Sequence, residues 1–113
     1  MISIEDLIYQ VKSYNPFADF NSIKEAYNYG FIAHKGQYRA SGEIYFTHPV
    51  EVAKIIIDLK LDESTIKTAL LHDTVEDTDS SLKQLEVAFG SEVSQLVDGV
   101  TKLTNLELSS LET

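Results

Sequence analysis

Cysteine is absent from this chain of 113 residues, and long apolar runs are absent as well. Without thiols there are no disulfides and no thiolate ligands, so any bound metal must be held by imidazole nitrogen and carboxylate oxygen. That donor set favours Mn, Fe, Zn, Co or Mg. Apolar runs reach only the length of Ile55-Ile56-Ile57, and the chain starts without a signal peptide pattern. The sequence therefore predicts a cytoplasmic protein that does not associate with membranes.

Basic residues are scarce. Nine lysines and arginines stand against eighteen acids, which leaves a net charge of −9, and Arg39 is the only arginine. This charge repels a nucleic-acid backbone, so we expect no DNA or RNA partner. It also repels a small polyphosphate, which would therefore need a metal ion and a few well-placed cations to bind.

Length and composition predict one globular domain that covers residues 1–113. A chain of this size can remove roughly two thirds of its unfolded surface from water, enough to form a core. Its 43% hydrophobic and 24% charged residues match ordinary globular proteins.

Apolar spacing predicts an all-α bundle of about six helices. Their predicted caps or first residues are Ser3, Asn21, Thr47, Asp62, Ser81 and Ser91. The second helix should end at Gly36, with an inward face that includes Phe31 and His34, and the fourth should run from Glu63 to about Val75. A capping box that joins Ser81 and Gln84 predicts a fifth helix over 82–89, and residues 37–46 read as an irregular loop.

A polar cluster, His72-Asp73 followed by Glu76-Asp77, emerges from the otherwise apolar fourth helix. A buried His-Asp pair is costly unless it is satisfied, and a divalent cation would satisfy it. His48, at the start of the third helix, could complete the site, and the ion would acidify a bound water. Alternatively, the histidines are hydrogen-bonded core residues and the acids form a solvated loop. His34 reads as a core residue or as a support to the metal ligands.

Four motifs, together with the Phe-Gly pair at 89–90, resemble the HD-domain hydrolase half of the RelA/SpoT enzymes, which make and degrade the alarmone ppGpp of the stringent response. They occupy residues 33–43, 45–53, 70–78 and 98–103. The resemblance implies an HD-type helical bundle and a Mn-dependent hydrolase that converts ppGpp to GDP and pyrophosphate, or acts likewise on pppGpp.

The same resemblance implies a role for each matching residue. His48, His72 and Asp73 look like metal ligands, and Glu76 and Asp77 look like the acid/base pair that handles the attacking water. Arg39 occupies the place of a residue that packs against guanine, and Ser41 belongs to the same nucleotide-binding loop.

Three departures from the family pattern affect these expectations. Ala40 replaces a basic residue, Ile44 replaces a proline, and the Asp-Arg-Leu-His-Asn stretch that carries the fourth metal ligand is expected beyond residue 103 but is not in this chain. We therefore expect a domain that lacks its C-terminal helices, with activity lost or dependent on a partner.

Leucines in a weakly ordered tail over 104–113 would then be exposed, and could support a homo-oligomer or bind a complementing fragment. This predicts an alternative function as a non-catalytic remnant or interaction subunit of a split RelA/SpoT protein. A second alternative is an HD phosphohydrolase that acts on another nucleotide.

Overall fold

Seven α-helices and one isolated β-bridge occur in residues 1–112, which this computed structural model describes, with side chains described to residue 106. The helices are α1 (Ile4–Lys12), α2 (Phe20–Ala33), α3 (Thr47–Asp58), α4 (Glu63–Leu71), α5 (Thr74–Asp77), α6 (Leu82–Phe89) and α7 (Ser91–Glu112). The all-α prediction is confirmed, and the extra helix is the single turn α5, which the sequence had merged into the fourth helix.

Three helix starts have the side-chain caps that the sequence predicts. The hydroxyl of Ser3 accepts a hydrogen bond from the amide of Asp6 (3.2 Å), and the carboxylate of Asp62 accepts one from the amide of Thr65 (2.9 Å). Ser81 and Gln84 form both bonds of a capping box. Each cap satisfies an amide that has no partner within its helix, so these starts are set locally.

The predicted start of α2 is wrong by two residues. Asp19, and not Asn21, caps the helix by accepting from the amide of Ser22 (3.1 Å). Both residue types cap well, so tertiary contacts decide between them. The amide of Asp19 donates to the Glu63 side chain (3.2 Å), and the earlier start places Phe20 against the core.

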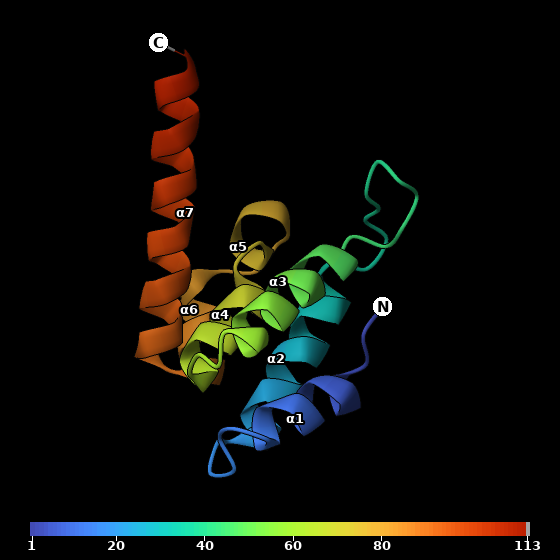
Figure 1. Cartoon of the computed structure of the whole chain (residues 1–113). Helices are drawn as coiled ribbons and strands as arrows, with labels where there is room; N and C mark the ends of the chain where they lie inside the picture. Colours follow the sequence, from blue (N-terminus) through green and yellow to red (C-terminus); the bar gives the residue numbers. More distant parts are fainter. Residues whose placement is uncertain (113) are drawn as a thin grey trace.

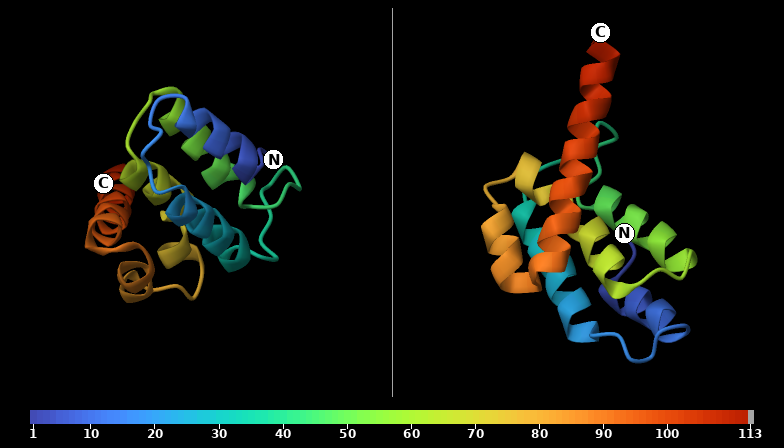
Figure 2. Two further views of the ribbon diagram at one scale, coloured as in Figure 1. Left: turned by 90° about the horizontal axis from the view of Figure 1, so that it is seen from below. Right: turned by 90° about the vertical axis from the view of Figure 1, so that its left-hand side faces the viewer.

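The central helix of the bundle is α4, which packs against α2, α3 and α7. Helix α1 lies against α2 and α3 on one side, and α6 packs beside α7 on the other (Figure 1). The far part of α7 projects beyond the remaining helices, as the right-hand view of Figure 2 shows. None of the described helices combines the length and apolar character needed to cross a membrane.

Ser91 is the first residue of α7 and not its cap, and the helix continues to Glu112. Leu103 and Leu106, on the projecting part, are 68% and 66% exposed. The predicted tail over 104–113 therefore has a helical backbone to Glu112, whereas the side chains of Leu108 and Leu111 lie outside the described set.

The core forms where α2 and α4 approach each other across Gly30. The largest fully buried side chains are Phe46, Leu7, Ile23, Ile66, Leu70, Leu71 and Leu85. Phe46 packs edge-on against Tyr27, with ring centroids 5.2 Å apart. Phe46 also covers Gly30, so Phe31 is displaced to the rim, where 45% of it is exposed. The prediction that Phe31 faces inward is therefore wrong.

Gly30→Ala should destabilise the fold although alanine favours helix. An added Cβ would overlap the Phe46 ring and would lie 2.8 Å from the carbonyl oxygen of Leu70, a backbone atom that cannot move aside freely. We expect the free energy of unfolding to fall by about 1–3 kcal/mol in urea titrations, as for other overpacked cores.

Gly99→Ala is the matched control, because Gly99 lies in α7 with nothing within 4 Å of an added Cβ. Helix propensity alone should then stabilise the protein by about 0.5–1 kcal/mol. Similar changes for the two variants would contradict a close α2–α4 approach.

Candidate metal centre

Three of the predicted site residues come together where α3 begins, α4 ends and α5 begins. His48 lies in the first turn of α3, His72 follows the last residue of α4, and Asp73 precedes α5. One potential ligand atom from each residue lies within 4.8 Å of the other two. Two imidazoles and a carboxylate are thus close enough to share one cation, and we call His48, His72 and Asp73 the metal trio.

The prediction that the fourth helix continues to Val75 is wrong, because α4 ends at Leu71. At the C-terminal end of α4, side chains donate hydrogen bonds to backbone carbonyls of the helix. His72 Nδ1 lies 2.7 Å from the carbonyl oxygen of Ala69, and the buried hydroxyl of Thr74 donates to the carbonyl of Leu71 (2.8 Å). Such local bonds compete with continued helix. His72 and Asp73 keep right-handed helical backbone angles beyond this end, and their side chains approach each other there.

The bond to Ala69 determines which nitrogen of His72 can bind a metal. A carbonyl oxygen can only accept, so in neutral His72 the proton is on Nδ1 and Nε2 is a bare acceptor. Nε2 lies 3.2 Å from Oδ1 of Asp73. Two acceptors at this distance repel each other unless a proton or a metal ion lies between them. The arrangement therefore fits a divalent ion held by nitrogen and oxygen ligands.

Tyr45 supports the trio, and the sequence reasoning did not assign it a role. Its hydroxyl donates to Oδ2 of Asp73 (2.7 Å), and its ring lies 6.1 Å from that of His48. Burial, together with the hydrogen bond and negative charge of Asp73 and the nearby Asp77, raises the pKa of Tyr45 well above its usual value. The hydroxyl therefore remains a donor that orients the carboxylate. The sequence indicates a role for Tyr45 in the site only through its position three residues before the candidate ligand His48.

Glu76 and Asp77, the predicted acid/base pair, lie on the single turn of α5 and are exposed. The backbone amide of Asp77 donates to the backbone carbonyl of Asp73 (3.0 Å). Asp77 is therefore close to the metal trio, and its assignment as acid or base remains a prediction.

Arg39 and Ser41 lie on the loop between α2 and α3, at the edge of the bundle in Figure 1. A bridge between Tyr38 and Ile44 closes this loop. The Arg39 guanidinium lies 3.2 Å from the Glu51 carboxylate and 3.7 Å from that of Glu43. A nucleotide that binds Arg39 must therefore compete with two carboxylates.

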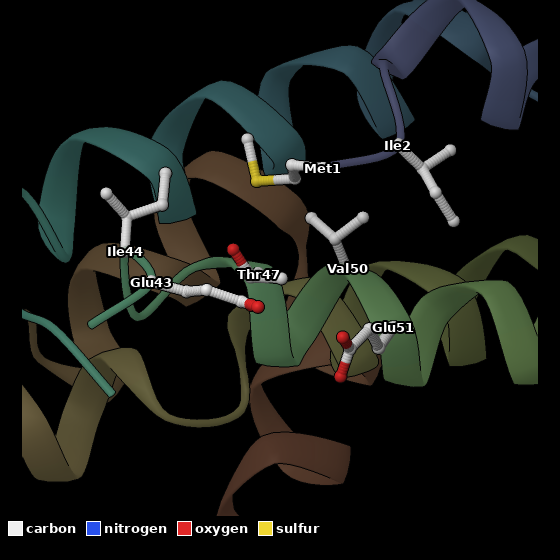
Figure 3. A pocket seen from close by; sticks show the side chains of 7 residues that line it. All are labelled: Met1, Ile2, Glu43, Ile44, Thr47, Val50 and Glu51. Carbon is white, nitrogen blue, oxygen red and sulfur yellow. The ribbon is translucent and has the colours of Figure 1, made fainter. Parts of the chain in front are cut away.

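A cleft next to this loop has none of the metal trio in its lining. It has a volume of about 840 Å³ and is lined by Met1, Ile2, Glu43, Ile44, Thr47, Val50 and Glu51 (Figure 3). The two carboxylates of its lining, Glu43 and Glu51, are those that pair with Arg39.

Comparisons with known proteins agree with this geometry. The family model described as HD domain matches residues 26–112. A GTP pyrophosphokinase of Myxococcus xanthus is 53% identical over 100 residues, which is 88% of this chain and 13% of that protein. The bifunctional (p)ppGpp synthase/hydrolase SpoT of Escherichia coli K12 is 43% identical over 107 residues, which is 95% of this chain and 15% of SpoT.

A solved structure is also similar. It is described as a metazoan ortholog of SpoT that hydrolyses ppGpp, and it matches with a TM-score of 0.65 and 34% identity, over 68% of this chain and 46% of that one. The present chain thus spans only a small part of the curated relatives. Fold, paired histidines and matched sequence agree, and the chain belongs to the HD-domain family, within its RelA/SpoT group.

Proposed function

We propose that this domain is a metal-dependent hydrolase that removes the 3′-pyrophosphate of ppGpp to leave GDP. The observation that carries the proposal is the metal trio, whose three ligand atoms lie within 4.8 Å of one another beside an acidic turn. Relatives whose names describe ppGpp hydrolysis support the choice of substrate. We propose manganese as the metal, and pppGpp as a second substrate.

Each residue has a defined task in this proposal. His48, His72 and Asp73 hold the ion, and Tyr45 orients Asp73. When bound, the ion supplies positive charge at the phosphate and acidifies water. The α5 carboxylates of Glu76 and Asp77 handle the protons. Water attacks the phosphorus atom that is bonded to the 3′ oxygen, and the bond between this phosphorus and the 3′ oxygen breaks. A proton taken from the water is transferred to the departing 3′ oxygen.

A second candidate function is that of an interaction subunit which is active only with a partner. The two exposed leucines of the projecting α7, Leu103 and Leu106, favour it, because they present apolar side chains to the surface. The partner would be a second copy of the chain or a helical fragment that supplies a further carboxylate ligand.

His72→Ala should abolish tight Mn²⁺ binding measured by calorimetry. Changes outside the ligand set commonly cost about 10- to 100-fold in affinity, so loss of a ligand should cost more than about 100-fold. Asp79→Asn is the control, because Asp79 is an exposed acid of the same segment outside the trio. Unchanged affinity in His72→Ala would exclude the trio as the metal site.

Tyr45→Phe should weaken Mn²⁺ binding by about 10- to 100-fold. The phenyl ring keeps the packing against His34, at 4.8 Å between ring centroids, but loses the bond that orients Asp73. Circular dichroism should show an unchanged helical content. An affinity equal to that of the unmodified protein would mean that the hydroxyl does not support the trio.

Asp77→Asn should lower kcat for pyrophosphate release from ppGpp by about 100-fold or more, with Mn²⁺ affinity retained, because proton transfer typically contributes 10²- to 10⁴-fold. Asp79→Asn should keep its activity.

If the unmodified chain binds Mn²⁺ but releases no pyrophosphate, it is not a hydrolase by itself. Turnover restored by an added helical fragment would then support the interaction subunit, and phosphate release from another nucleotide alone would identify a different substrate.

A further inference from the structure

Two side chains next to the site connect the end of α2 to the end of α5. The amide nitrogen Nε2 of Gln37 donates to the backbone carbonyl of Asp77 (2.7 Å), across 40 residues of sequence. The amide oxygen of Gln37 lies 2.8 Å from Nδ1 of His34, the residue that caps the C-terminus of α2. We call this pair of bonds the His34–Gln37 strap.

The donors and acceptors of the strap can be assigned without ambiguity. The carbonyl of Asp77 can only accept, so the nitrogen of the Gln37 amide must face it and the oxygen must face His34. The amide oxygen can also only accept, so Nδ1 of His34 must carry a proton. In neutral His34 this leaves Nε2 as a bare acceptor.

The surroundings of His34 hold its ring in place. The side chain is only 2% exposed, and its ring lies 4.8 Å from that of Tyr45 and 6.3 Å from that of Phe46. Nε2 is buried and has no hydrogen-bond partner within the described part of the chain. The bond to Gln37 is therefore the one hydrogen bond that the described part of the chain offers to this ring, and it favours the observed orientation.

We infer that His34 and Gln37 are positioning residues that hold the carboxylates of α5 against the metal trio. This inference rests on the proposed function. A helix of four residues has little stability of its own, and Glu76 and Asp77 are exposed. The strap attaches the last residue of this turn to the rigid end of α2. Small displacements of a catalytic group can cost about 100-fold in rate, so such an attachment has a catalytic consequence.

Gln37→Met should separate positioning from metal binding. The variant keeps the length of the side chain, removes both bonds and adds no charge. We expect kcat for ppGpp to fall by about 10- to 100-fold, while Mn²⁺ affinity changes by less than about twofold because the trio is untouched. Gln37→Glu should behave similarly, since it still accepts from His34 but has no N–H for Asp77. Gln95→Met, at an exposed glutamine of α7, is the matched control and should retain full activity.

Two measurements test the strap without relying on activity. Long-range ¹H–¹⁵N correlation spectra of the metal-free protein should show the proton of His34 on Nδ1. In Gln37→Met, hydrogen exchange should speed up by at least about tenfold at the amides of Asp77 and Thr78, which bond to Asp73 and Thr74. Exchange at Leu85 in α6 should not change.

The outcomes separate the strap from the proposed function. A proton on Nε2 of His34, or unchanged exchange at Asp77, overturns the strap itself. Full kcat in Gln37→Met, in a protein that hydrolyses ppGpp, overturns the positioning role but leaves the proposed function intact. No turnover in the unmodified protein overturns the proposed function and the catalytic consequence together, while the spectra still decide whether the strap exists.

Discussion

The close approach of α2 and α4 at Gly30 is the constraint on which the rest of the structure depends. Only a residue without a Cβ allows Phe46 and the Leu70 carbonyl to lie so near to the α2 backbone. Phe46 is the residue just before α3, so its burial also determines where α3 begins. The neighbours of Phe46 in sequence, Tyr45 and His48, are thereby directed at the end of α4.

The end of α4 creates the chemistry of the site. His72 and Thr74 bond to carbonyls of the last turn of α4, and three ligand atoms converge at this point. The end of α4 also leaves α5 as an isolated turn, which is why its attachment through Gln37 matters.

The electrostatics of the chain also favour a role for a metal. Several of its few cations already have carboxylate partners, namely Arg39, Lys54, Lys67 and Lys102. Lys67 is buried and lies between Glu63 and Ser22, so it supports the fold and not a ligand. With a net charge of −9, the proposed hydrolysis of a polyphosphate would draw its positive charge largely from a bound ion.

The sequence by itself determined the features that depend on neighbours three or four residues apart. The caps at Ser3 and Asp62 and the capping box of α6 were readable for this reason. The motifs around His48 and His72 were readable through their resemblance to the RelA/SpoT family. Tertiary structure decided between alternatives that the local pattern allows equally, such as the cap of α2. The choice of Asp19 as a cap depends in part on Glu63, which is 44 residues away.

The bonds of Tyr45 to Asp73 and of Gln37 to Asp77 join residues 28 and 40 positions apart. Such contacts depend on tertiary packing, including that of Phe46 over Gly30, because local propensity does not bring those segments together. The sequence thus identified the candidate ligands, and the tertiary structure decided which side chains orient and hold them.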